Sequence, residues 1–127
     1  MDFSEYRAKL EQLGADLDDS AQRVLTRMNA KGMNVTVKAT PVDTGHLRRM
    51  WFAGATKRVG NGYESRYYNN TYYAGYVNNG HRVVRNGKTV GYVNGVRMLE
   101  QGQTAAKESA DSIFNAEIQR IKQKGGW

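Results

Sequence analysis

A single proline divides the chain into two regions with different residue patterns. Pro41 has no backbone N–H and biases Thr40 toward extended conformations, so a helix that reaches this point should end at about Ala39. Before Pro41, apolar residues recur at three- and four-residue steps, as in an amphipathic helix. After it, short aromatic runs are broken by Asn and Gly, as in strands joined by turns. The change favours an α+β fold that begins with a helix.

The region before the proline predicts one long helix. Gly14 and Gly32 each weaken it by up to roughly 1 kcal/mol. Residues 35–37 would also suit a strand, but helix is favoured because no partner strand precedes them. A continuous helix would be about 50 Å long, so either its distal end protrudes or the helix breaks near Gly32. Its apolar stripe, which would pack on the protein's own sheet or in part on a neighbouring subunit, consists of Phe3, Tyr6, Leu10, Leu13, Leu17, Val24, Leu25 and Met28.

The residues around the proline predict a rigid corner. Residues 42–45 suit a tight turn, because the Asp-Thr pair can hydrogen-bond to nearby backbone N–H groups and Gly45 tolerates a positive φ. If the next turn is helical, Leu47 and Trp51 share one face and two arginines flank them. The structural corner is therefore Pro41, Asp43, Thr44, Gly45, Leu47 and Arg48.

Residues 50–59 and 63–69 predict two antiparallel strands, joined by the turn Gly60-Asn61-Gly62. Residues 72–77 suit either a third short strand or a helical turn. Residues 81–93 predict a further hairpin, because Asn86-Gly87 is a strong signal for a two-residue turn. This hairpin carries Arg82, Arg85 and Lys88, and we expect an exposed, mobile arm that orders on meeting a partner, with an ordinary solvated loop as the alternative for any single residue in it.

A second amphipathic helix is predicted from Arg97 to just before Gly125. The whole chain, residues 1–127, is then one α+β domain. It has a long N-terminal helix, a small antiparallel sheet of about three strands, a mobile hairpin and a C-terminal helix. The apolar positions of the second helix are Leu99, Ala106, Ala110, Ile113, Phe114, Ile118 and Ile121.

The net charge and the tyrosine content of the chain indicate which kinds of partner it would bind. Nineteen Lys and Arg against 12 Asp and Glu give a formal charge of +7, which favours nucleic acid or an acidic protein surface. Seven of the eight tyrosines lie between Tyr63 and Tyr92. They could stack on bases, but a half-buried face or a subunit interface is favoured. The chain has no cysteine, and no apolar run approaches the ~18 residues of a membrane span. We expect no membrane association.

The sequence predicts no catalytic site, metal or cofactor. His46 and His81 are far apart, with no metal-ligand spacing around them. Asp43 and His46 could form an acid–base pair, although turn capping by Asp43 beside a surface imidazole is favoured. No pair of carboxylates falls in an aromatic-lined stretch where a cleft would be expected, since Glu64 and Glu100 each stand without a second acid nearby in the sequence. The protein is therefore not expected to be an enzyme.

Three blocks of the sequence together resemble a bacteriophage neck family, the tail-completion or head–tail joining proteins of long-tailed phages and prophages. The first block reads Pro-Val-Asp-Thr-Gly-His-Leu-Arg at 41–48. The second, 73–82, is similar to the family's Tyr-Ala-x-x-Val-Glu-x-Gly segment, and the third, 91–99, resembles the segment that leads into its last helix. Asn78 stands where the family has Glu, so a role of that carboxylate is not carried over.

The resemblance implies a structural virion protein that joins the tail to the head-side connector. It would act as a homo-oligomeric ring, with a hexamer as the candidate copy number, between the tail tube or terminator and the connector. Assembly would take place in the host bacterial cytoplasm, and the alternative function is a nucleic-acid-binding module with a basic, tyrosine-rich surface. The candidate interface residues are Tyr73, Ala74, Val77, Gly80, Arg82, Arg85, Lys88, Met98 and Leu99.

Overall fold

The computed structural model describes residues 3–42 and 45–125, so Asp43 and Thr44 of the predicted corner lie outside the described residues, as do the side chains of Phe3 and Tyr6. The predicted α+β fold, with a long helix at the N-terminal end and another at the C-terminal end, is confirmed. The helices are α1 (Phe3–Ala39), α2 (His46–Arg49), α3 (Ala74–Asn79) and α4 (Met98–Gly125). The strands are β1 (Trp51–Ala53), β2 (Lys57–Val59), β3 (Gly62–Glu64), β4 (Tyr67–Asn69), β5 (Gly80–Arg85) and β6 (Lys88–Asn94).

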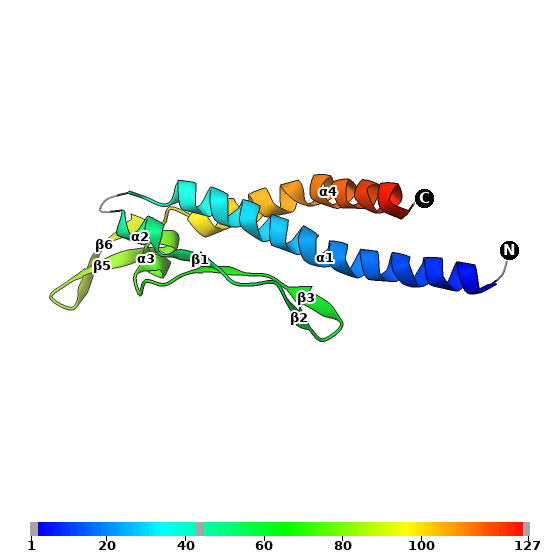
Figure 1. Ribbon diagram of the computed structural model, residues 1–127. Coiled ribbons are helices and arrows are strands. Elements are labelled where there is room, and N and C mark those ends of the chain that lie inside the picture. The colour runs from blue at the N-terminus through cyan, green and yellow to red at the C-terminus, as the bar shows by residue number, and fades with distance from the viewer. Residues whose placement is uncertain (1–2, 43–44, 126–127) are drawn as a thin grey trace.

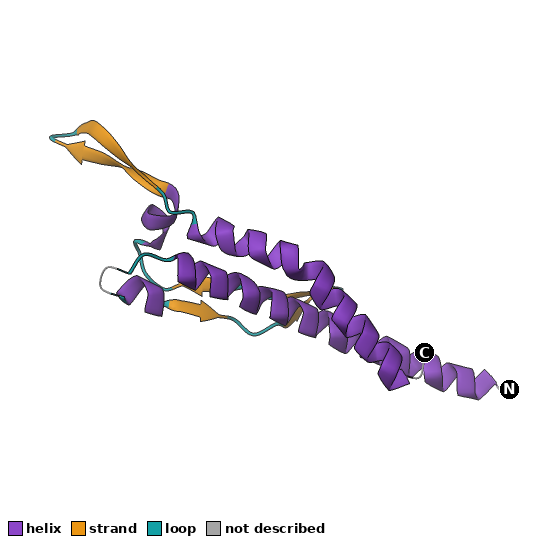
Figure 2. Ribbon diagram, turned by 90° about the horizontal axis from the view of Figure 1, so that it is seen from above, coloured by secondary structure: helices purple, strands orange, loops and turns teal. Residues whose placement is uncertain are grey.

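The two long helices lie side by side and run in opposite directions (Figure 1). Helix α1 ends at Ala39, as the proline predicts, and it is continuous through Gly32 and residues 35–37. Its N-terminal turns extend beyond the end of α4 in two perpendicular views (Figures 1 and 2). Of the two predicted alternatives for this long helix, the protruding end is therefore the one observed.

Two glycines set the distance between the helices. A Cβ atom at Gly102 would overlap the Thr36 Oγ1 atom and the Gly32 carbonyl oxygen, and would lie 2.7 Å from the Tyr67 hydroxyl oxygen. Both Gly32 and Gly102 are buried. The helices therefore approach backbone to backbone at this point, which only glycine permits. Gly32 therefore has a role in helix packing, although glycine has a low helix propensity.

The hydrophobic core lies beside this close approach, at the end of the molecule that carries α2 and α3. Its fully buried members are Leu47, Trp51 and Met98. Several polar groups beside it are joined by hydrogen bonds. The Trp51 Nε1 atom donates to Thr40 Oγ1 at 2.9 Å, and Thr40 Oγ1 donates to the Thr36 carbonyl at 2.7 Å. The Thr36 and Tyr67 hydroxyls share a hydrogen bond of 2.9 Å.

The strands form three separate two-stranded antiparallel pairs. The predicted hairpin over 50–69 is present, but it is interrupted, so that β1 pairs with β4 and β2 pairs with β3. This ribbon runs along α1 (Figure 1), to which it is tied by a 3.1 Å hydrogen bond from Asn29 Nδ2 to the Arg66 carbonyl. Of the two alternatives for residues 72–77, the helical one is observed, as α3.

The third pair, β5–β6, projects as an arm from the end of the molecule opposite the chain termini (Figures 1 and 2). The turn at its tip uses Asn86 and Gly87, whose φ angles are 51° and 75°. Two consecutive positive φ angles are typical of a type I′ turn, the form that the Asn-Gly pair predicts. The predicted hairpin is therefore confirmed, and its mobility stays a prediction.

The helix packing can be tested with two glycine substitutions that share the same chemistry. Gly102→Ala should destabilise the protein by about 1–3 kcal/mol, because the added methyl group has no space between α1 and α4. Gly14→Ala, where nothing lies within 4 Å of the added Cβ, should instead stabilise it by about 0.5–1 kcal/mol. Urea unfolding followed by circular dichroism measures both. Equal effects of the two changes would contradict the close approach.

Candidate docking surfaces

The structure brings together residues from all three sequence blocks at the hydrophobic core. Leu47 from the first block and Met98 from the third are buried. Five more pack partly buried against this cluster: Tyr73, Ala74, Val77, Val96 and Leu99. Their contacts within the chain account for their apolar character, and a further contact of these residues with a partner stays a prediction.

The corner after α1 is held by an arginine. The Arg48 Nη2 atom donates to the carbonyl oxygens of Lys38 at 3.1 Å and Thr40 at 2.9 Å, at the end of α1. The last carbonyls of a helix have no partner within it, so Arg48 satisfies them. Gly45 has a φ of 79°, as predicted, and the Leu47 carbonyl accepts a 2.9 Å hydrogen bond from Asn69 Nδ2. Arg48 therefore has a structural role, because it holds the corner against the end of α1.

His46 lies on the surface of this corner. Its side chain is exposed, and its ring centroid is 6.5 Å from that of Tyr73. Because Asp43 lies outside the described residues, the acid–base pair with His46 is not tested. Within residues 3–42 and 45–125, no group of three or more Asp, Glu and His side chains could hold a metal ion.

Asn78 connects α3 to the start of α4. Its side chain is buried, and its Oδ1 atom accepts a 2.9 Å hydrogen bond from the Leu99 N–H. Its Nδ2 atom donates to both carboxylate oxygens of Glu100 at 3.1 Å. Arg97 Nη1 also lies 3.7 Å from the Glu100 carboxylate, so Glu100 contacts an amide and a cation. A Glu at position 78 would repel Glu100, so the amide suits this chain.

The Asn78 contact can be tested by changing charge at nearly constant shape. Asn78→Asp should destabilise the protein by about 1–3 kcal/mol, because a carboxylate would face Glu100 with no donor between them. Adding Glu100→Gln should restore much of the loss, since that amide can donate to the new carboxylate. Thermal unfolding at pH 7 measures this coupling. Asn70→Asp, at an exposed position, is the matched control and should change little. A double variant no more stable than Asn78→Asp would refute the pairing.

The base of the β5–β6 arm depends on two close backbone contacts. Gly80 has a φ of 84°, and a Cβ atom there would overlap the Val93 carbonyl oxygen. A Cβ at Gly95 would overlap the Asn78 carbonyl oxygen. Glycine is needed where backbones approach this closely. Gly80 is one of the residues that match the family segment, and its structural role is to let the backbone turn where the arm leaves α3.

The arm itself is basic and uncovered. Arg82, Arg85 and Lys88 are all exposed, and the stretch 65–99 contains no Asp or Glu that could neutralise them. All seven residues of β6 are exposed, and neither strand pairs with another element among the described residues. Several large apolar side chains are also open to solvent on the arm: Val84, Val90, Tyr92 and Val93.

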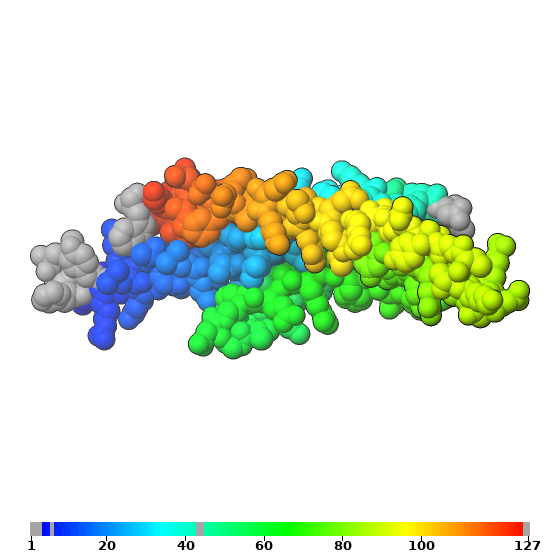
Figure 3. Space-filling view, turned by 180° about the vertical axis from the view of Figure 1, so that it is seen from behind, coloured from blue at the N-terminus to red at the C-terminus, as the bar shows by residue number. Residues whose placement is uncertain are grey.

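A second apolar surface lies toward the other end of the molecule. It is a groove of about 450 Å³ between α1, α4 and the tip of the β2–β3 pair. In Figure 3 the green tip of that pair and the orange part of α4 lie on either side of α1. Leu17 on α1 and Phe114 on α4 line the groove, and 45% and 54% of their surfaces are exposed. A 2.6 Å hydrogen bond from the Tyr63 hydroxyl to Asp18 holds the tip against α1.

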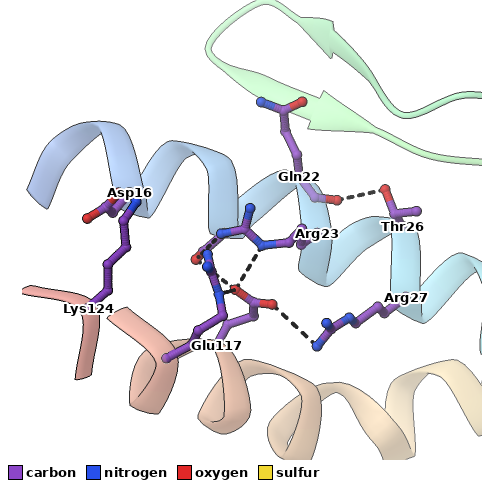
Figure 4. Close-up of polar contacts among 9 residues, drawn as sticks. Asp16, Gln22, Arg23, Thr26, Arg27, Glu117 and Lys124 are labelled. Atoms are coloured by element: carbon purple, nitrogen blue, oxygen red, sulfur yellow. Dashed lines mark hydrogen bonds and ion pairs between the residues drawn. The ribbon is translucent and has the colours of Figure 1, made fainter. Parts of the chain in front are cut away.

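Glu117 forms a polar clamp between the helices beside this groove (Figure 4). Its side chain is 1% exposed, and its Oε2 atom accepts hydrogen bonds from Ser20 Oγ at 2.9 Å and Arg23 Nε at 3.1 Å. Arg120 Nε donates to the same oxygen at 3.2 Å, and Arg27 Nη1 lies 3.3 Å from Oε1. A second link nearby joins Lys124 to the buried Asp16 at 2.8 Å. Four groups of α1 and α4 thus converge on one carboxylate.

Burial raises the pKa of Glu117, while hydrogen bonds from Arg23 and Ser20 and the charges of Arg23 and Arg27 lower it. The net pKa lies below the ordinary value of 4.5. Sequence reasoning missed this residue. The available signal was a charged side chain on the apolar face of the second helix, one turn after Phe114 and before Ile121. A lone acid at such a position indicates a buried charge with partners elsewhere.

Glu117→Gln should destabilise the protein at pH 7 by about 1–3 kcal/mol, because three arginines lose the negative charge that they contact. The loss is moderate because the arginine side chains are partly exposed to water. Since the folded pKa is lowered, this stabilisation is present above pH 4.5 and is lost as the pH falls through the folded pKa. Denaturant unfolding from pH 7 to pH 3 should show a smaller loss in the variant. Glu108→Gln, on the exposed face of α4, is the control. Parallel pH profiles for wild type and Glu117→Gln would exclude the clamp.

The comparisons with known proteins give one match. Residues 4–80, more than half of the chain, match the model of the HK97-gp10-like family, described as "Bacteriophage HK97-gp10, putative tail-component". The chain belongs to this family. No curated protein and no solved structure gives a significant match.

Membership in the HK97-gp10-like family makes the chain a structural component of bacteriophage tails, and so of the virion. The predicted resemblance to phage tail-completion proteins fits this family. The matched region contains α1, the corner, the ribbon and α3, and it ends where the arm begins. In the described ranges, no helix is both long enough and apolar enough to span a membrane.

Proposed function

We propose that this tail component completes the tail and joins it to the head-side connector, as one subunit of a ring around the channel through which DNA passes. The observation that carries the proposal, beside the family, is how little apolar surface the chain buries by itself. Within the described residues, four hydrophobic side chains are buried and thirteen large ones are exposed. A monomeric protein seldom leaves such a balance. The subunit completes its burial against other proteins.

The proposed role needs docking rather than chemistry. One surface of the ring contacts the tail tube or terminator and the opposite surface contacts the head connector. The exposed cations of the arm, with no acid in their stretch of sequence, favour acidic partner surfaces. Assembly takes place in the host bacterial cytoplasm, and the protein performs no catalysis and needs no cofactor. Each of these statements follows from the proposed neck role.

The neck role can be tested by removing the gene from its phage or prophage. DNA-filled heads and finished tails should accumulate separately, since the joining component is missing, and the wild-type gene supplied in trans should restore joined particles. Electron microscopy of negatively stained lysates measures the fraction joined. A lysate without tails would assign the protein to an earlier step of tail assembly, and joined particles in its absence would exclude the role.

DNA binding through the arm is the second candidate, because Arg82, Arg85 and Lys88 are exposed on a narrow ribbon. Filter binding of short duplex DNA at two salt concentrations separates it from docking. Phosphate contacts by three cations would give a log–log salt slope of roughly −0.9 per phosphate. A docking protein should retain DNA weakly, and replacing the three residues by alanine should then affect particle joining more than DNA retention.

A further inference from the structure

Each molecule carries an uncovered apolar arm toward one end and an uncovered apolar groove toward the other. The arm is the β5–β6 pair, and the groove lies between α1, α4 and the β2–β3 tip. In Figure 3 the arm lies at the far right, well away from the green tip beside the groove. We propose that the arm of one copy seats in the groove of the next copy, so that the subunits join head to tail. The inference rests on the proposed ring and names its contact.

The arm has the properties of a segment that is completed by a partner. A two-stranded ribbon on its own is marginally stable in water, and this one has open edges along both strands among the described residues. Tyr92 lies directly opposite Arg82, and 65% of its surface is exposed. Val84, two residues after Arg82 on β5, is 49% exposed. The chain itself covers neither apolar side chain.

The groove can cover the apolar side chains that the arm leaves exposed. Its walls are mainly apolar, and Leu17 and Phe114 stand open to solvent, so a few apolar side chains of a ribbon can be buried there. Asp18 lies on one wall with 47% of its side chain exposed, although Arg58 of the same chain lies 3.9 Å from its carboxylate. The arm brings Arg85 and Lys88 and no acid. The apolar surfaces of the arm and the groove are thus complementary, and Asp18 presents a partly exposed carboxylate to the cations of the arm.

A second copy is the occupant that these observations favour, because every chain presents both surfaces. A contact between two different surfaces of identical subunits is heterologous, and it closes into a ring when the rotation per subunit divides a full turn. Pairing of arm with arm would give a two-fold dimer and would leave the groove empty. The arm-to-groove contact is therefore of the kind from which the closed ring of the proposed neck role can be built.

The absence of cysteine in the chain permits a direct test by disulfide cross-linking. Tyr92→Cys on the arm and Phe114→Cys in the groove are made in separate copies, which are co-expressed with the remaining particle genes. Purified particles should contain dimers linked between the two variants after mild oxidation. Tyr72→Cys, which is 91% exposed and belongs to neither surface, is the control and should not link to Phe114→Cys.

The other outcomes of this test overturn the inference in distinguishable ways. Joined particles that contain both variants without a cross-link would refute the arm-to-groove contact and leave the neck role intact. Dimers formed by Tyr92→Cys alone would show pairing of arm with arm, and a link from Tyr92→Cys to a different virion protein would assign the arm to that partner. Joined particles that lack the protein would refute the neck role together with the inference.

A complementation experiment adds a second readout. The arm variant Val84→Ser with Tyr92→Ser and the groove variant Phe114→Ser should each lower the fraction of joined particles at least tenfold. When the two variants are co-expressed, the only intact contact joins the arm of the groove variant to the groove of the arm variant. Joining should therefore stay low, while non-covalent heterodimers form in the soluble fraction. Both changes remove exposed side chains, and circular dichroism should show unchanged folding. Full joining by Phe114→Ser alone would contradict the proposal.

Discussion

The backbone contact between Gly32 and Gly102 is the constraint on which the rest of the structure depends. Because Gly102 has no side chain, the hydroxyls of Thr36 on α1 and Tyr67 on β4 have room to meet there, and they share a hydrogen bond of 2.9 Å. That bond holds the β1–β4 ribbon against α1 and places Trp51 beside Met98. A methyl group at Gly102 would push the helices apart and loosen the ribbon with them.

The helix pair is held differently along its length. Near the corner it is joined by apolar packing around Leu47 and Met98. Toward the termini buried charged groups join the buried Ile121, with Glu117 between three arginines and Asp16 bonded to Lys124. A buried ion pair gives little net stability compared with apolar packing, but it penalises a shifted alignment, because each displaced charge would lose its partner. The clamp therefore fixes the register of α1 against α4 and with it the groove.

This arrangement leaves apolar surface at both ends and suits a subunit of an assembly. The family match covers α1 through α3 and stops at Gly80, while the arm and α4 follow it. Asn78, at the last buried position before the arm, bonds to both Leu99 and Glu100 and so ties the two regions together. The arm is thus anchored at its base and uncovered along its length, which is the geometry that the proposed contact with a second copy uses.

Local chemistry in the sequence determined where the elements begin and end. Pro41 lacks an N–H and ended α1, Asn86-Gly87 accepts positive φ and made the arm's turn, and the three- and four-residue spacing gave both long helices. Only the tertiary structure decided how these elements meet. It paired Gly32 with Gly102, Asn78 with Glu100 and Glu117 with Arg23, and it placed Tyr73 against the core. These contacts join residues far apart in the chain, and periodicity and turn propensity report only on near neighbours. A residue's distant partner depends on how the backbones pack, which no local pattern encodes.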